Sequence, residues 1–519
     1  MARAQGPIEQ VIRQRVAEHP QSTWLKWKAD EVPWADVLSN AQRAANGLLE
    51  LGARPGERVA ILMGNRPEFL WAHLGILFIG ALSVPVNISQ RGRTLQHILA
   101  DSDSVAVILQ DDLVDALEAV RSGLPVLRRT VVVDGPAHRA DWTFDRLMEG
   151  ADEEPDVELP EPTGGVGMMY TSGTTGPPKG VVATKYDTGP LGLILRAGGV
   201  QPGETMYTPL PLSHGNALLV SALGSMMLDA KLALAERFSA SRFFDDCRRY
   251  DAVSFNTLGG MISILLKQPP RPDDTDNPVR TVLSAGCPPD RWEEFEKRFG
   301  VRIVEWFGMV DSPGFLLNEE GRVGSMGKPI AGIEFRVVDD NDQPLDPKQV
   351  GELQFRHPLG RMTHYHKLPE ATDEAYRGGW FHTGDLAEQD DDGFFYYRGR
   401  KKEAMRRLGE NISAWEIETV VNSHPDVREC AAHAVRSVLG EDEVKLVVVA
   451  QPGAKPTPVE ILDYCTGRMA HYAIPRYVEF VDQLPKTGTE RIQYAALKER
   501  GITSETWDRE QAGYKVSKV

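Results

Sequence analysis

The chain has little cysteine. Its 519 residues include only Cys247, Cys287, Cys430 and Cys465, and no two of them form a C-x-x-C pair. This wide spacing argues against a zinc cluster and against a disulfide framework. Unpaired thiols are typical of a reducing compartment, so we expect a cytoplasmic protein.

Long apolar runs are also missing. The stretch Leu70–Val84 contains His73 and is shorter than the roughly 18–20 residues that a bilayer span requires. The N-terminus has no apolar signal core. Instead, Ile8, Val11 and Ile12 recur at helical spacing. We therefore expect no membrane anchor.

Positive charge is in deficit. Lysine and arginine number 58 against 74 aspartate and glutamate residues, which gives a net charge of −16. Nonspecific binding to nucleic acid or to an anionic membrane surface favours basic patches, so we expect neither partner. The sequence leaves a homodimer open.

The pattern of apolar segments predicts an α/β fold. Short apolar runs that read as buried strands alternate with helical patterns over the first four hundred residues. An apolar helix is expected from about Pro67 to Ala81, and a connector over Asp152–Glu161. The expected strands are Arg58–Met63, Val105–Leu109, Thr130–Val133, Ala252–Phe255, Thr281–Ser284 and Val301–Glu305.

The last 120 residues follow a different pattern. A helix at 414–422 precedes strand-like runs at 428–435 and 444–450, and a second helix is expected from Pro458 to about Ala470. At this length the chain should hold at least two domains. We predict a large layered α/β domain over residues 1–399 and a small mobile α+β lid over 400–519. The basic segment Arg398–Asn411 would be the hinge.

The sharpest local signal is TSGTTGPPKG, residues 171–180. Glycines let a backbone turn and direct its N–H groups at an anion, and hydroxyl groups add further donors. Lys179 adds a positive charge. Because Gly180 follows Lys179, the segment is not the P-loop pattern G-x-x-x-x-G-K-[ST]. We predict a phosphate-binding loop; a plain surface loop is the alternative.

This string resembles the signature of the adenylate-forming superfamily of acyl-CoA synthetases, luciferases and nonribosomal-peptide adenylation domains. The resemblance runs from about Arg58 to Arg491, and RRLGENISAWEIE looks closest to the carnitine/crotonobetaine-CoA ligase-like branch. It implies that the loop binds ATP. The loop residues are Thr171, Ser172, Gly173, Thr174, Thr175, Gly176 and Lys179, with Lys179 also catalytic.

Further motifs follow in the family's order. PLSHGNA resembles a motif whose histidine, here His214, lies near the acyl group and acts in catalysis. SAGCP resembles a stretch that lines the adenine and the acyl site, which implies nucleotide contacts for Gly286 and Cys287 and an acyl contact for Ala285. Taken alone, His214 would be an ordinary core histidine and SAGCP an ordinary turn.

The segment EWFGMVDS matches the family's aromatic-Gly-x-Thr-Glu motif imperfectly. The resemblance places Phe307 against adenine, and it places Asp311 where the family has a magnesium-binding glutamate. Aspartate keeps the charge on a shorter arm. Val310 stands in for a threonine and lacks its hydroxyl. The implied nucleotide-binding residues here are Trp306, Phe307, Gly308, Met309 and Asp311.

Three motifs near the domain boundary continue the resemblance. GWFHTGD implies that Asp385 accepts hydrogen bonds from the ribose hydroxyls. YYRGRKKE implies that Arg400 reaches the ribose or the phosphates and that Lys402 is the pivot. RLGENIS resembles a segment that approaches CoA, which implies contacts for Gly409, Glu410 and Asn411.

The final motif departs from the family. PKTGTERIQ places Arg491 where the family has a lysine that stabilises negative charge during adenylation. Arginine is also cationic, but it is bulkier and planar. Three alternatives follow: Arg491 stabilises this charge, a nearby lysine such as Lys486 or Lys498 replaces it, or adenylation is weak or absent.

By resemblance, the protein is an ATP-dependent carboxylic acid–CoA ligase. It would form an acyl-adenylate and use ATP, Mg²⁺ and coenzyme A. The expected acyl-pocket residues are His214, Asn256, Thr257 and Ala285. Trp306, which is read equally well as a core residue, and the glycines at 259–260 favour a flat or medium-sized apolar acid. The alternatives are an enzyme that loads a carrier protein and a catalytically weak nucleotide-binding relative.

Overall fold

The computed structural model describes residues 7–159, 167–171, 177–183, 189–330, 332–401, 404–407, 410–436, 442–466, 468–469, 473–487 and 491–515. Its contacts divide the chain into two compact units. Of the described residues, the first unit holds those up to 171, 177–334 and 356–381, and the second unit holds 335–355 and those from 382 onward. This division does not coincide with a boundary at 399/400, and the predicted hinge position remains a prediction.

In the middle of one sheet of the first unit lie parallel strands that the sequence predicted. The strand order is β16-β15-β14-β13-β12-β10-β11-β1-β2, and the pairs from β14 to β1 are parallel. The bounds are β1 Thr23–Trp27, β2 Asp30–Pro33, β10 Thr205–Thr208, β11 Lys231–Leu234, β12 Ala252–Leu258, β13 Thr281–Ala285, β14 Arg302–Phe307, β15 Leu316–Asn318 and β16 Lys328–Pro329.

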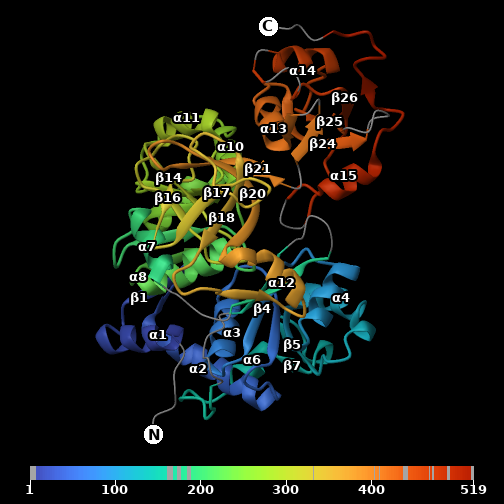
Figure 1. Cartoon of the computed structure of the whole chain (residues 1–519). Coiled ribbons are helices and arrows are strands. Elements are labelled where there is room, and N and C mark those ends of the chain that lie inside the picture. The colour runs from blue at the N-terminus through green and yellow to red at the C-terminus, as the bar shows by residue number, and fades with distance from the viewer. Residues whose placement is uncertain are drawn as a thin grey trace. The chain divides into compact units, whose positions relative to one another are not determined.

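A second, wholly parallel sheet has the order β4-β3-β5-β6-β7. Figure 1 draws it between α3 and α4. Apolar side chains of α4, such as Leu95 and Ile98, pack with Val107 and Leu109 of β5. The bounds are β3 Arg58–Leu62, β4 Leu82–Pro85, β5 Ser104–Gln110, β6 Arg129–Val133, β7 Trp142–Thr143, α3 Pro67–Phe78 and α4 Gly92–Asp101.

A small antiparallel sheet, β19-β9-β8, completes the sheets of this unit. Its strands are β8 Met168–Thr171, β9 Lys179–Ala183 and β19 Thr363–Tyr365. The remaining longer helical segments are α1 Pro7–Glu18, α2 Trp34–Leu51, α5 Val114–Glu118, α6 Phe144–Leu147, α7 Gly189–Ala197, the π-helix η4 Asn216–Leu223, α8 Gly224–Leu228, α9 Phe243–Tyr250, α10 Gly259–Leu266, α11 Pro289–Phe299 and α12 Pro369–Ala375.

The second unit contains the predicted C-terminal α+β pattern. Its strands form the sheets β17-β18-β20-β21, β22-β23 and β24-β25-β26-β27. The bounds are β17 Glu334–Val338, β18 Gly351–Arg356, β20 Phe381–Gln389, β21 Phe395–Arg400, β22 Ala404–Arg407, β23 Glu410–Ser413, α13 Ala414–Asn422, β24 Val427–Arg436, β25 Asp442–Ala450, α14 Pro458–Cys465, β26 Tyr477–Phe480, α15 Tyr494–Arg500 and β27 Trp507–Asp508.

The predicted elements agree with the structure in type, and the helix predicted at 414–422 has the same bounds in α13. The ends of other predicted elements differ. The helix predicted to reach Ala81 ends at Phe78, because Gly80 takes a positive φ of 70° that terminates it. The helix predicted to reach Ala470 ends at Cys465. Residues 154–159 of the predicted connector have no regular secondary structure.

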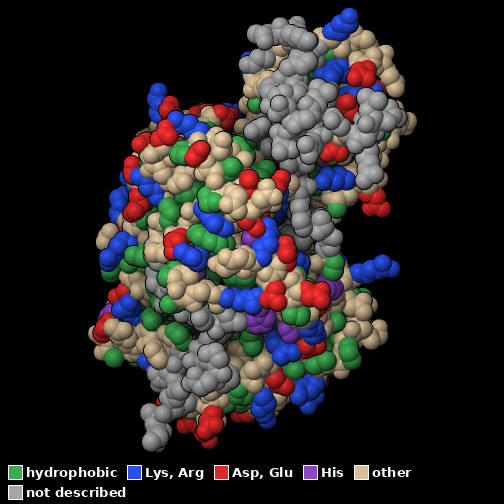
Figure 2. Space-filling view, viewed as in Figure 1, with side chains coloured by type: hydrophobic (Ala, Val, Ile, Leu, Met, Phe, Trp, Pro, Cys, Tyr) green, Lys and Arg blue, Asp and Glu red, His purple; other side chains and the backbone are tan. Residues whose placement is uncertain are grey.

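Within the described part of the chain, no helix is long and apolar enough to cross a membrane. All four cysteines lie in this part, and all four are buried and free. On the face that Figure 2 shows, acidic and basic side chains are interspersed.

Candidate active site

Three neighbouring parallel strands of the first unit become less buried at their carboxyl ends. Strands β12 and β13 are buried up to their last residues, and β14 is buried between its two ends. The last residues of the three strands are the half-buried Leu258, Ala285 and Phe307. Since the strands are parallel, these three residues lie at the edge of the sheet that the carboxyl ends of its strands form. Open α/β sheets bind ligands at this edge.

Two distant motifs meet beside this edge. The Thr171 hydroxyl at the end of β8 lies 3.4 Å from Asp311 Oδ1, although 140 residues separate them in the chain. Tyr365 of β19 donates its hydroxyl to the same carboxylate oxygen over 2.9 Å. The Thr363 hydroxyl donates to the backbone carbonyl of Asp311. The structure therefore brings together the two predicted residues Thr171 and Asp311.

Tyr365 and Thr363 belong to a segment without a recognisable sequence motif. Burial, and then the neighbouring Asp311 charge, raise the pKa of the Tyr365 hydroxyl, so it remains a hydrogen-bond donor at neutral pH. The pairing of β19 with β9 brings this residue to the site.

Lys179 completes this group of residues. It lies opposite Thr171 in the β8–β9 pair, and its ammonium group stands 4.7 Å from the centre of the Tyr365 ring. A cation, a hydroxyl and a carboxylate thus converge on one place. Mg²⁺ typically takes one or two protein carboxylates together with phosphate oxygens, and Asp311 fits that role. Residues Ser172–Gly176 of the predicted loop lie outside the described residues.

The PLSHGNA segment packs against the same group. A methyl group added to Gly215 would lie 2.8 Å from Val310 Cγ2 and 3.9 Å from Met169 Sδ. The flanking residues are the half-buried His214 and the buried Asn216, which is the first residue of η4. The close approach explains why glycine stands at 215, and it places His214 one residue from the contact with Val310.

Glu305 is a residue that sequence reasoning left without a role. Its carboxyl group accepts hydrogen bonds from the backbone N–H groups of Gly286 and Cys287, the latter over 3.1 Å. Burial raises the pKa of Glu305 to about 8, although the two N–H groups act to lower it. Glu305 thereby fixes the turn where nucleotide contacts were predicted, and Gly286 takes a positive φ of 93° there.

Trp306 is buried beside the edge. Its ring packs so closely on Gly308 that a methyl group on that glycine would lie 2.8 Å from it. Within the described part of the chain, its indole Nε1 has no hydrogen-bond partner. Both interpretations of Trp306, core residue and pocket wall, agree with this packing.

Asp385 and Arg400 meet within the second unit. They are paired across β20 and β21, and Arg400 Nε lies 2.9 Å from Asp385 Oδ1. The Asp385 side chain is only 2% exposed, while that of Arg400 is 38% exposed. The two predicted nucleotide residues therefore form an ion pair, and the Arg400 side chain is the one that is open to solvent.

A neighbouring cluster has the composition of a metal site. Ligand atoms of Asp342, Glu352 and His382 lie within 4.8 Å of one another. Lys401 Nζ, however, already lies 3.1 Å from Glu352 Oε2. Burial acts to raise the pKa of Glu352, but hydrogen bonds from His382 and Lys401 lower it to about 2. The lysine occupies the cation position, so we assign no metal here.

Arg491 is exposed in the second unit, and its backbone is hydrogen-bonded to Thr487. Thr487 N donates to Arg491 O over 2.7 Å, and Arg491 N donates to Thr487 Oγ1 over 3.2 Å. Lys486, one of the alternative cations, pairs with Glu429 at 2.6 Å. Glu410 and Asn411 lie on β23, without described side chains, and Lys402 and Gly409 lie outside the described residues.

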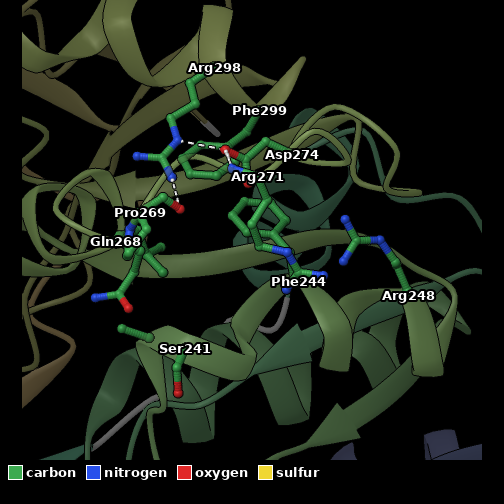
Figure 3. Close-up of a pocket in the computed structure, with 11 residues that line it drawn as sticks. Ser241, Phe244, Arg248, Gln268, Pro269, Arg271, Asp274, Arg298 and Phe299 are labelled. Carbon is green, nitrogen blue, oxygen red and sulfur yellow. Dashed lines mark hydrogen bonds and ion pairs between the residues drawn. The ribbon is translucent and has the colours of Figure 1, made fainter.

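A separate pocket of about 190 Å³ contains none of the predicted site residues (Figure 3). Its floor is the stacked pair Phe244 and Phe299, whose ring centres are 4.3 Å apart. Arg271 at its rim binds Asp245 and Asp273. Figure 3 shows Arg298 joined to Asp274, at 2.8 Å. Because these charges neutralise one another, the pocket offers little attraction to an anionic substrate.

The chain is similar to known proteins over most of its length. Residues 12–366 match the model of a family described as AMP-binding enzyme, and residues 416–491 match its C-terminal domain. A sulfoacetate–CoA ligase from Cupriavidus necator is 32% identical over 94% of this chain and 96% of its own length. A crotonobetaine/carnitine–CoA ligase from Salmonella agona is 27% identical over 90% of this chain and 92% of its own.

Solved structures agree over nearly the whole chain. The O-succinylbenzoate CoA synthetase MenE of Bacillus subtilis, in complex with AMP, has a TM-score of 0.82 at 26% identity and covers 94% of this chain and 98% of its own. The anthranilate CoA ligase AuaEII, in complex with anthranoyl-AMP, has a TM-score of 0.85 at 25% identity and covers 95% and 96%.

Proposed function

The chain belongs to the family of AMP-binding enzymes and is a carboxylic acid–CoA ligase that uses ATP, Mg²⁺ and CoA; on this premise we propose which of its residues carry each step. In the first half-reaction the substrate carboxylate attacks the α-phosphorus of ATP and pyrophosphate leaves. In the second, the CoA thiolate attacks the acyl carbon and AMP leaves with the bonding electron pair.

The group of Thr171, Lys179, Asp311 and Tyr365 supports the first step, and it is the observation on which the assignment rests. Lys179 and Thr171 bind phosphate oxygens. Asp311, oriented by Tyr365, holds Mg²⁺, which neutralises phosphate charge when bound. His214 lies near the substrate carboxylate. Phe307 stacks on adenine, and Asp385 with Arg400 binds the ribose.

Arg491 supplies the positive charge that stabilises the transition state of adenylation. Its exposed position supports this role, and Lys486, an alternative cation, is paired with Glu429. For the second half-reaction we propose a rotation about Lys402 that withdraws Arg491 and brings Gly409, Glu410 and Asn411 to the thiol arm of CoA.

The acceptor is CoA rather than a carrier protein, since the relatives named above are CoA ligases. Their names also favour small carboxylic acids as substrates. We further propose a cytoplasmic location, because four buried, free cysteines suit a reducing compartment. A homodimer remains a proposal.

Pyrophosphate release with Mg·ATP tests the function across a panel of carboxylic acids, with and without CoA. We expect at least one small acid to trigger release, and CoA to yield the thioester and AMP in equal amounts. An acyl-adenylate that a carrier protein accepts but free CoA does not would contradict the choice of acceptor.

A further inference from the structure

Two asparagines form a buried carboxamide pair behind the candidate site. Asn256 Nδ2 on β12 donates to Asn216 Oδ1 on η4 over 2.6 Å. Asn256 is fully buried and Asn216 is 6% exposed. The sequence had suggested Asn256 as an acyl contact and had given no role to Asn216.

One hydrogen-bond donor and one hydrogen-bond acceptor of this pair remain unbonded within the described part of the chain. Within the described part of the chain, Asn216 Nδ2 and Asn256 Oδ1 have no hydrogen-bond partner. Rotating both amides by 180° exchanges the roles of the two residues but still leaves one N–H group and one oxygen unbonded. Buried polar groups in folded proteins nearly always have partners, so these two atoms point to a ligand group that supplies both bonds.

The position of the pair suits the distal end of a substrate. Asn256 lies two residues before Leu258, the half-buried end of β12, and alternate residues of a strand share a face. The pair therefore lies about 7 Å below the open edge of the sheet. Asn216 directly follows Gly215, which packs on Val310 beside Asp311. It also begins a π-helix, a feature frequent at functional sites.

We propose that the acyl substrate carries a neutral polar group at its distal end, a hydroxyl or a carboxamide, and that Asn216 and Asn256 bind this group. The proposal rests on the proposed function. A hydroxyl or an amide both donates and accepts, whereas an anion only accepts and an ammonium group only donates. Either charged group would leave one of the two buried atoms unbonded. An apolar acid would leave both unbonded.

Matched pairs of acids test the proposal on the full-length wild-type enzyme. 4-Hydroxybutanoate is compared with pentanoate, and succinamate with 4-methylpentanoate, by kcat/KM for pyrophosphate release. We expect the polar member of each pair to be favoured at least about tenfold, because its apolar analogue leaves buried polar groups unpaired. Equal or better use of the apolar acids would overturn the inference alone and would mean that water occupies the pair. If no acid triggers pyrophosphate release, the proposed function itself is overturned, and the inference with it.

The variants Asn256→Leu and Asn216→Leu assign the preference to these residues. We expect either change to bring the ratio between the paired acids close to one. The ratio is measured on one preparation, so partial unfolding cancels. The control is Ser254→Ala, which removes a buried hydroxyl one layer further from the edge on the same strand and should leave the ratio unchanged. An undiminished ratio in both leucine variants would contradict the assignment.

Discussion

The Tyr365 hydroxyl donates a hydrogen bond to Asp311 Oδ1 over 2.9 Å. The same ring lies under the ammonium group of Lys179, 4.7 Å from its centre. One aromatic side chain thus orients the proposed metal-binding carboxylate and contacts the proposed phosphate-binding cation. No motif in the sequence indicated this arrangement.

Replacing Tyr365 with phenylalanine should weaken the use of Mg·ATP. The ring and its contact with Lys179 remain, but Asp311 loses a donor that fixes its orientation. We expect kcat/KM for Mg·ATP to fall by about tenfold, the equivalent of one ordinary hydrogen bond. Titration of pyrophosphate release against Mg²⁺ should show a weaker apparent affinity for the metal. Tyr396→Phe, which removes a 3.0 Å bond to Asp390, is the matched control and should leave both values unchanged.

Arg491 should matter to adenylation and not to thioester formation. We expect Arg491→Ala to slow pyrophosphate release by roughly 100-fold, as for the loss of one charge-stabilising group. Arg491→Lys should retain most of the rate, because it keeps the charge. Consumption of a synthetic acyl-adenylate by CoA should be unaffected in both. If Lys486→Ala instead abolishes release, then Lys486 and not Arg491 supplies the charge.

Glu305 should make the fold less stable as pH rises. Its folded pKa of about 8 exceeds the ordinary value of 4.5, so between these values the folded protein holds a proton that the unfolded chain has released. The free energy of unfolding should therefore fall from pH 4.5 to pH 8, by on the order of a few kcal/mol. Urea denaturation of Glu305→Gln should show a flatter profile. A wild-type profile that rises throughout this window, with no change in the variant, would contradict the assignment.

His73 should act in the opposite direction at lower pH. It is fully buried in α3, neither ring nitrogen has a partner within the described part of the chain, and burial lowers its pKa to about 4. The unfolded chain binds a proton near pH 6.5, so stability should be lost as pH falls from 6.5 to 4.

His73→Leu should remove this loss. At pH 5 we expect the variant to gain about 2 kcal/mol relative to the wild type, compared with their difference at pH 7.5, as measured by urea denaturation. The exposed His138→Leu serves as a control and should show no such gain. A parallel pH dependence in the wild type and His73→Leu would contradict the explanation.

The sequence by itself determined the class of fold and the chemistry of several positions. Continuous apolar runs such as Val105–Leu109 can only be buried strands or buried helices, and their alternation with helical patterns predicted the layered α/β arrangement. The 171–180 string predicted phosphate binding, because its residue types are suited to anions wherever the chain places them. Helix ends were less certain, since termination at Gly80 depends on a local backbone conformation.

Only the tertiary structure decided which of these residues meet. Thr171 reaches Asp311 because β8 and the end of β14 are brought together across 140 residues, and Tyr365 arrives through the pairing of β19 with β9. Glu305 binds the backbone of Gly286, nineteen residues earlier in the chain, and Asn216 binds Asn256, forty residues later. Periodicity and motif spacing describe neighbours along the chain, whereas these contacts depend on sheet order and register, which long-range packing sets.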